Sequence, residues 1–230
     1  VDKSMLIEDI LVNRAAVTLF TRPRRFGKTL NMSMIKYFFD IRNKDENRKL
    51  FEELKIFGSE YMREQGKYPV IFVSLKDLRG DTWEDTFENL KSFISDLYAE
   101  FEDMREIMNK RDKIKFDKIF YEEEKGDYET ALKLLSNYIY KYYGKKVIIL
   151  IDEYDAPIIN AFDKGYYNEA INFFQVFYSS ALKTNDSLKY GILTGITRII
   201  KEGIFSGLNN LKVDTILNKK YSEYFGLLEN

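Results

Sequence analysis

The chain has 230 residues, of which 45% are hydrophobic and 32% are charged, and its formal net charge is -1. This length suits one sizeable α/β domain or two small ones, and the balanced charge gives no global sign of a nucleic-acid coat or of a trap for acidic substrates. Cysteine and histidine are both absent, which excludes disulfides, thiolate zinc sites and imidazole bases and leaves any catalysis to carboxylates, lysine, arginine, hydroxyls or a metal held by oxygen ligands.

The two ends of the chain give the first expectations. The opening residues, VDKSMLIEDI, are charged and lack the apolar core of a signal peptide. No apolar run reaches the roughly 18 residues that a transmembrane helix needs. We therefore expect a cytoplasmic protein with no membrane contact. Because the chain does not begin with Met and stops at YFGLLEN, we also expect it to be a piece of a longer protein.

The N-terminal part predicts helix, strand, loop and helix in that order. Apolar residues at helical spacing within 2–13 predict a short amphipathic helix, and residues 16–20, AVTLF, predict a β-strand. The strand leads into a basic loop over 21–28, and residues 28–41 continue at helical spacing. Strand, loop and helix in this order are the context that a phosphate-binding P-loop requires. The expected apolar face of this helix is formed by Leu30, Met34, Ile35 and Phe38.

The middle of the chain predicts a strand followed by helices. Residues 69–75, PVIFVSL, are too continuously apolar for a half-exposed edge and predict a buried parallel strand. A long helical pattern covers 82–109 and a second helix is expected over 127–143, so we expect a helical insertion around 82–143. We interpret the charged run between these helices as a solvated surface that is helical only in part. The inward positions of the second helix are Leu132, Leu135 and Ile139.

The last third alternates strands with a helix. Residues 145–155, KKVIILIDEYD, form the most apolar strand and end in acids; a helix over 168–184 and a strand over 188–196 follow. Residues 198–210 are expected to be helical or irregular, and 212–217 predict a fifth strand. Strands that alternate with helices specify a parallel sheet covered on both faces. The predicted fold class is α/β, a three-layer αβα sandwich with a mostly parallel central sheet of about five strands.

The loop RPRRFGKT has the end of a P-loop but lacks its first glycine. Gly27 permits a close approach of the backbone to a phosphate, Lys28 supplies an ammonium group, and Thr29 supplies a hydroxyl for Mg2+ at the start of a helix. In the usual pattern, G-x-x-x-x-G-K-[ST], a glycine stands where this chain has Arg22, and Pro23 beside it restricts φ and can hold the loop rigid. The alternative is a basic turn at the start of a helix with a chance GKT.

Acidic residues follow the strand that ends in VIILID. In P-loop ATPases the Mg2+ is held by the Ser or Thr of the loop and by an Asp at the tip of a buried strand, the position of Asp152. The adjacent Glu153 can accept a proton from the attacking water. The alternative is an acidic turn that caps a strand, but both motifs in the expected order favour the nucleotide site. We expect Asp155 to cap the next helix.

The strand over 188–196 ends in LTGITR, and ligands of such sheets lie at the carboxyl ends of the strands. Thr194 is predicted to contact the water or the γ-phosphate as a polar sensor, and Arg198 is predicted to reach phosphate. The alternative is an ordinary strand end with a surface arginine, since position in the fold is the sole basis of this prediction.

Taken together, the segments VDKSMLIEDIL, TRPRRFGKTLNMSMIKYFF, VIILIDEYDAPI, GILTGITRI, IFSGLNNL and YSEYFG resemble the AAA-ATPase-like family of bacterial proteins. The resemblance spans nearly the whole chain, and in this family an arginine at the first loop position is usual. It implies a P-loop NTPase domain over 1–230 that binds ATP and Mg2+, with an additional strand between loop and acidic motif. The metal ligands it implies are Thr29 and Asp152. The resemblance implies that Gly27, Lys28 and Thr29 form the nucleotide-binding loop. The further residues expected to bind the nucleotide are Arg24, Arg25, Phe26, Leu30 and Thr194.

Full-length members of this family commonly continue into a helical region, or lid, and a C-terminal domain that resembles PD-(D/E)XK nucleases, and we expect both to lie outside this chain. The resemblance implies that nucleic acid is contacted, if at all, through that domain, which is the expected partner of this chain.

Three functions remain open from the sequence. The leading one is an ATPase that couples its nucleotide state to a C-terminal effector, with Glu153, Lys28 and Arg198 as catalytic residues. Arg24 and Arg25 are further candidates for the arginine that neutralises charge in the transition state. The second is a nucleotide-gated switch with little turnover of its own. The third, a direct DNA-binding module, rests on the arginine cluster and dispersed lysines.

Overall fold

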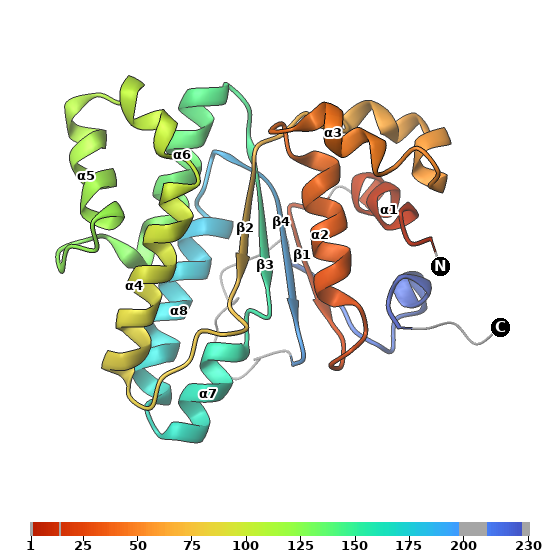
Figure 1. Ribbon diagram of the computed structural model, residues 1–230. Coiled ribbons are helices and arrows are strands. Elements are labelled where there is room, and N and C mark those ends of the chain that lie inside the picture. Colours follow the sequence, from red (N-terminus) through yellow and green to blue (C-terminus); the bar gives the residue numbers. More distant parts are fainter. Residues whose placement is uncertain (1, 14, 198–210, 227–230) are drawn as a thin grey trace.

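A five-stranded sheet lies at the centre of the molecule, and all of its strand pairs are parallel (Figure 1). The computed structural model describes residues 2–13, 15–197 and 211–226. The strand order is β2-β3-β4-β1-β5, so β4 separates β1, which leads into the loop, from β3, which ends in the acidic residues. The strands are β1 (Val17–Thr21), β2 (Val70–Ser74), β3 (Val147–Asp152), β4 (Leu188–Gly195) and β5 (Leu211–Asp214).

Helices cover both faces of this sheet, which confirms the predicted three-layer α/β sandwich (Figure 1). One face carries α1 (Met5–Asn13) and α2 (Lys28–Phe39), and a short helix, α3 (Lys44–Lys49), follows α2. The opposite face carries α4 (Trp83–Ala99), α5 (Lys110–Phe120), α6 (Ala131–Tyr143), α7 (Ala156–Lys164) and α8 (Tyr167–Leu182). Turns of 3-10 helix occur at η1 (Lys55–Gly58), η2 (Glu60–Glu64), η3 (Glu102–Ile107), η4 (Tyr128–Thr130) and η5 (Lys219–Tyr224).

Alternation along β3 decides which helical layer each side chain meets. Ile149 and Ile151 pack into the core beneath α4–α8, whereas Ile148 and Leu150 pack into the core beneath α1 and α2. Because successive side chains of a strand point to opposite faces, Asp152 faces the α2 side. The side chain of Asp152, at the end of this buried strand, therefore lies on the same side of the sheet as α2, the helix that follows the loop.

The position of β2 in the sheet differs from the prediction. The strand is parallel and Val70 and Ile71 are fully buried, as expected, but β2 lies at an edge of the sheet, with β3 as its neighbour. Its apolar side chains are buried because helices cover the faces of the sheet. An edge position leaves backbone groups unpaired on one side and does not require polar side chains.

Three predictions about the helices also need correction. The pattern over 82–109 is not one helix, because Phe101 leaves helical geometry (φ -124°, ψ 23°) after α4, and η3 follows. The charged run after it is not only solvated surface: α5 buries Phe116 and Ile119 completely in the core. On α2, Leu30 is 70% exposed rather than inward, since it belongs to the first turn, beside the loop.

None of the helices in the described part of the chain combines the length and the hydrophobicity that a bilayer-spanning segment requires.

Candidate functional site

The loop between β1 and α2 has the backbone of an anion-binding turn. Gly27 precedes α2 with φ +74°, a left-handed conformation that favours glycine, and its carbonyl accepts from the amide of Asn31 at 3.0 Å. Arg25 also has a positive φ, 66°. The first amides of a helix have no partner inside it and favour negative charge. The start of α2, directly after this turn, is thus the kind of helix N-terminus at which a phosphate can bind.

Lys28 is folded back onto the loop. Its Nζ donates to the carbonyl oxygens of Arg22 at 3.0 Å and Pro23 at 2.9 Å, and the residue is 5% exposed. Burial lowers the pKa of this ammonium group, and the nearby carboxylates of Glu153 and Asp152 oppose that shift. The ammonium group of Lys28 therefore lies against the backbone of the loop that is expected to hold a phosphate.

Thr29 and Asp152, the two residues predicted to hold a metal, lie together. The hydroxyl of Thr29 donates to Asp152 Oδ2 at 2.7 Å, across the gap between α2 and β3. Asp152 is completely buried, and its other oxygen, Oδ1, accepts a short hydrogen bond from the hydroxyl of Thr194 on β4. The carboxylate is thereby oriented by hydroxyl groups from two different elements.

This donor set fits Mg2+. Thr29 and Asp152 offer hard oxygen ligands, and Mg2+ is usually held by one or two carboxylates together with waters and substrate phosphates. Within residues 2–13, 15–197 and 211–226 there is no group of three or more acidic side chains that could hold a metal without such outside ligands. The residues that are present thus suit a metal that arrives with a phosphate, not a metal cage made by the protein alone.

Glu153 has a backbone that few residues other than glycine adopt. Its φ is 52°, and its amide donates to the Thr194 hydroxyl at 3.3 Å. A left-handed conformation in such a residue costs on the order of 1–3 kcal/mol and is often found at functional sites. The half-buried side chain lines a cavity of about 130 Å³ together with Arg24 and Arg79. The turn therefore presents the carboxylate to a small polar space beside the loop.

Arg79 is a site residue that the sequence did not reveal. It lies between β2 and α4, is exposed, and lines the same cavity as Glu153. It belongs to no motif, and it reaches this position only because β2 and β3 are neighbours in the sheet, with Ser74 beside Asp152. No sequence signal could have found it without the strand order.

Asp155 does not have the predicted capping role. Helix α7 begins directly after it, but its side chain makes no cap hydrogen bond. Its Oδ2 instead accepts from the amides of Ile196 at 2.9 Å and Thr197 at 2.8 Å and from the Thr197 hydroxyl at 3.0 Å. The donors just beyond β4 thus occupy this carboxylate oxygen, and Asp155 connects the acidic turn to the end of β4.

Arg22 occupies the first loop position for a structural reason. It is 2% exposed, and its guanidinium donates to the carbonyl of Thr21 at 2.9 Å and to the carbonyl of Asp214 at 3.0 Å. It also pairs with Asp214 Oδ1 at 2.5 Å and lies 4.7 Å from the centre of the Phe225 ring. Arg22 therefore ties the loop to β5, which lies on the side of β1 opposite to β4 and β3.

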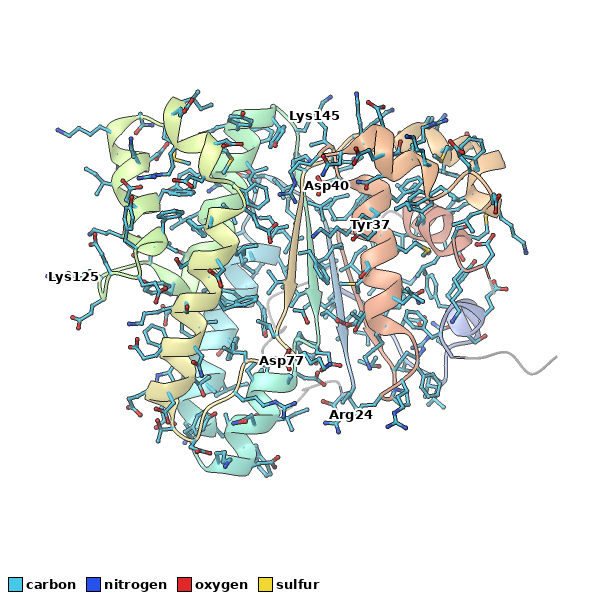
Figure 2. All side chains as sticks on the ribbon, viewed as in Figure 1. Arg24, Tyr37, Asp40, Asp77, Lys125 and Lys145 are labelled. Carbon is cyan, nitrogen blue, oxygen red and sulfur yellow. The ribbon has the colours of Figure 1, made fainter. Side chains whose placement is uncertain are left out.

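The other arginines of the motifs differ from Arg22. Arg24 and Arg25 are exposed, and Figure 2 shows Arg24 at the end of the sheet opposite to Asp40 and Lys145. Of the two, Arg24 lines the cavity that contains Glu153. Arg198, the third arginine proposed from the sequence, lies outside the described residues.

The segment YSEYFG packs against the outer side of the loop. Gly226 donates from its amide to the Phe26 carbonyl at 3.1 Å, and its own carbonyl accepts from Lys3 Nζ at 2.7 Å. The side-chain amide of Asn31 donates to the Tyr224 carbonyl at 2.8 Å. We call these contacts the loop clasp. Through it, segments near both ends of the sequence hold the outer side of the loop.

The family model described as Predicted AAA-ATPase matches residues 1–205. A protein of Azotobacter chroococcum mcd 1 with the name "Uncharacterized protein in vnfD 5'region" is 24% identical over 223 residues, which cover 95% of this chain and 38% of that protein. The chain thus spans well under half the length of this relative. A search of the solved structures found no match. The chain belongs to the AAA-ATPase-like family of predicted AAA-ATPases.

Proposed function

We propose that this chain is a nucleotide-binding domain that hydrolyses ATP with Mg2+. The observation that carries the proposal is the contact between Thr29 and Asp152 at 2.7 Å, at the carboxyl ends of parallel strands and directly beside the loop. Glu153 follows Asp152 with a left-handed backbone and lines an adjacent cavity. Loop, metal ligands and base thus converge from separate segments on one place.

The loop binds the phosphates. The amides at the start of α2 donate to phosphate oxygens, and Lys28 exchanges its bonds to the Arg22 and Pro23 carbonyls for a charge-assisted contact to phosphate. Because Lys28 is already buried against the loop, little side-chain ordering remains to be done on binding.

Thr29 and Asp152 hold the metal. When bound, Mg2+ neutralises negative charge on the β- and γ-phosphate oxygens. Thr194 orients Asp152 through its hydrogen bond and accepts from the Glu153 amide, so one hydroxyl positions both the metal ligand and the adjacent carboxylate. This is a positioning role; the sensor contact to the γ-phosphate predicted from the sequence stays a prediction.

Glu153 activates the water. Its carboxylate accepts a proton as the water oxygen bonds to the γ-phosphorus; the bond from that phosphorus to the β–γ bridging oxygen breaks, and ADP and phosphate leave. Charge in the transition state needs a cationic group. Arg24 and Arg79 line the cavity that holds Glu153, so they join Arg25 and Arg198 as candidates.

A nucleotide-gated switch is the second candidate, and the loop clasp is the observation that favours it. Gly226 and Tyr224 bond directly to the loop and to α2, so a loop that rearranges around phosphate changes contacts of the C-terminal segment. In this function the nucleotide state is passed to a C-terminal effector, the nuclease-like domain expected from the family, and nucleic acid is engaged by that domain.

Calorimetry and a turnover assay test these functions together. We expect Lys28→Ala to weaken Mg-ATP binding about 10- to 100-fold, as for loss of a charged hydrogen bond. Glu153→Gln should keep binding and lower turnover by about 10²- to 10⁴-fold. Lys49→Ala and Glu52→Gln, which change the same residue types at exposed positions on and just after α3, are the matched controls.

The outcomes separate the candidates. An ATPase shows turnover that Glu153→Gln removes, whereas a switch shows tight binding and slow turnover that this variant changes little. If wild type binds no Mg-ATP, or if Lys28→Ala binds as tightly as Lys49→Ala, both functions are wrong for this chain. Salt-sensitive DNA binding by the chain alone would favour the DNA-binding alternative instead.

A further inference from the structure

A second cavity lies away from the nucleotide site. It has a volume of about 500 Å³ and is formed by the start of α4, the turn η4 and α8. It shares no lining residue with the cavity beside Glu153, and no residue of the loop lines it. Figure 1 shows α4 and α8 on the face of the sheet opposite to α2, so the helices that line this cavity belong to the other helical layer.

Aromatic rings form one wall of this cavity. Trp83 lies 5.7 Å from Phe87 and 5.6 Å from Phe173, measured between ring centres, and Phe87 lies 5.7 Å from Tyr128 in an edge-to-face arrangement. Trp83 and Phe87 are only half-buried, although both stand in the core-facing row of α4. Their rings therefore offer π surface to the cavity instead of filling it.

The rim of the cavity is negatively charged. Asp127, Glu129 and Glu169 line it and are exposed, and no lysine or arginine is among its lining residues. Among the described residues, the ion pair that involves one of these three carboxylates is long: Lys115 Nζ lies 3.9 Å from Asp127 Oδ2. A further cation, Lys91, lies 5.9 Å from the centre of the Phe87 ring but is paired with Glu88 at 2.7 Å. The carboxylates are thus left without close neutralising partners.

We propose that this cavity binds an arginine side chain presented by a partner polypeptide. A guanidinium group stacks on the face of an indole or phenyl ring and pairs with a carboxylate through its parallel N–H groups. A planar cation is favoured over an ammonium group because Trp83 and Phe87 supply flat surface and Glu129 and Glu169 supply the acceptors. The cavity also has room for more than one side chain, as a polypeptide segment requires. The proposal does not depend on the nucleotide chemistry.

The chain carries its own reporter for this site. Trp83 is the only tryptophan, so its fluorescence follows occupancy of the cavity without a label. Wild-type protein would be titrated with the peptide acetyl-Gly-Arg-Gly-amide and with the matching citrulline peptide, which keeps the shape of the side chain and lacks its charge. We expect a saturable change in emission with the arginine peptide that weakens as salt is added, and no saturable change with citrulline.

Paired variants test the charge of the rim. Glu129→Gln/Glu169→Gln should weaken binding of the arginine peptide about tenfold, as expected for loss of close charge pairs. Glu52→Gln/Glu53→Gln removes the same charge from exposed positions after α3 and should leave binding unchanged. All four positions are exposed, so loss of the fold does not complicate the comparison.

Four results would overturn the proposal. One is an equal response to the citrulline peptide, and another is an equal loss of affinity in both double variants. The third is saturation by tetramethylammonium at the same concentration as by the arginine peptide, since this would make the cavity a site for small organic cations. Absence of any saturable signal with the arginine peptide would likewise exclude it.

Discussion

Replacing Asp214 should cost far more stability than replacing an exposed aspartate that has an ion pair of nearly the same length. Arg22 is 2% exposed and Asp214 is fully buried, and their pair measures 2.5 Å. Breaking a buried pair by removal of one partner leaves an uncompensated charge and costs about 3–5 kcal/mol. Asp214→Asn keeps the shape and removes the charge, so we expect a loss near the lower end of that range.

An exposed ion pair elsewhere in the chain provides the control. Lys164 and Asp81 are 2.6 Å apart, but their side chains are 48% and 81% exposed. Exposed pairs of this kind contribute little because water and salt screen them. Asp81→Asn should therefore leave the free energy of unfolding nearly unchanged. The two variants compare burial at almost constant ion-pair length.

Urea unfolding followed by Trp83 fluorescence and circular dichroism measures both variants. The midpoint should fall for Asp214→Asn with an unchanged slope, since the surface exposed on unfolding stays the same. Arg22→Gly, which restores the usual first glycine of a P-loop, should also be destabilising because it leaves the buried Asp214 carboxylate without its cationic partner. Equal midpoints for Asp214→Asn and Asp81→Asn, or a stabilised Arg22→Gly, would refute the structural role of Arg22.

A variant with apolar residues at both positions 22 and 214 tests how far the ion pair offsets the cost of burying its charges. Asp214 Oδ2 is buried and has no hydrogen-bond partner within the described residues, so the carboxylate does not fully recover its desolvation cost. Replacing both partners of such a pair by apolar groups is often neutral or stabilising. Arg22→Met/Asp214→Leu should thus recover much of the stability that Asp214→Asn loses.

Three further predictions concern the site. Thr194→Val removes a hydroxyl that orients Asp152 and should lower ATP turnover about 10- to 100-fold in a steady-state assay; unchanged turnover would contradict it. Asp155→Asn should lower the free energy of unfolding by about 1.5–3 kcal/mol through its weakened bonds to Ile196 and Thr197, whereas the exposed Asp163→Asn should not. Because burial lowers the Lys28 pKa below 10.5, Mg-ATP affinity measured by calorimetry should fall as pH rises toward 10.5, and Lys28→Arg should remove that dependence.

The lowered pKa of Lys28 also determines how the stability of the fold changes with pH. Between the lowered folded pKa of Lys28 and its unfolded value of 10.5, the unfolded chain binds more protons than the folded one. Stability therefore rises with pH across this window, as the buried ammonium group loses its charge. Nucleotide affinity moves in the opposite direction, so pH separates the cost of burying Lys28 from its contribution to binding.

Local patterns in the sequence were sufficient to predict most of the sheet and the pairing of loop with acid. The apolar run of β3 and the period-2 rule together bring Asp152 to the face that carries Thr29. What the sequence missed at the candidate site depended on contacts distant in sequence. The partner of Arg22 lies on β5, and Arg79 reaches the cavity through the β2-β3 pairing. The true acceptor role of Asp155 requires the donors beyond β4, which no local rule specifies.

These distant contacts give a structural reason for an arginine at the first loop position, where a glycine is usual. A glycine at the first loop position permits a backbone turn but anchors nothing, whereas Arg22 fixes the loop to β5 and to the ring of Phe225. Gly226, the next residue, donates to Phe26 within the loop. The loop is therefore held by the sheet on one side and by the C-terminal segment on the other, and a phosphate that moves the loop must act on both. An ATPase and a switch can share this construction, because the same contacts that hold the loop ready for phosphate also carry its movement to the segment beyond β5.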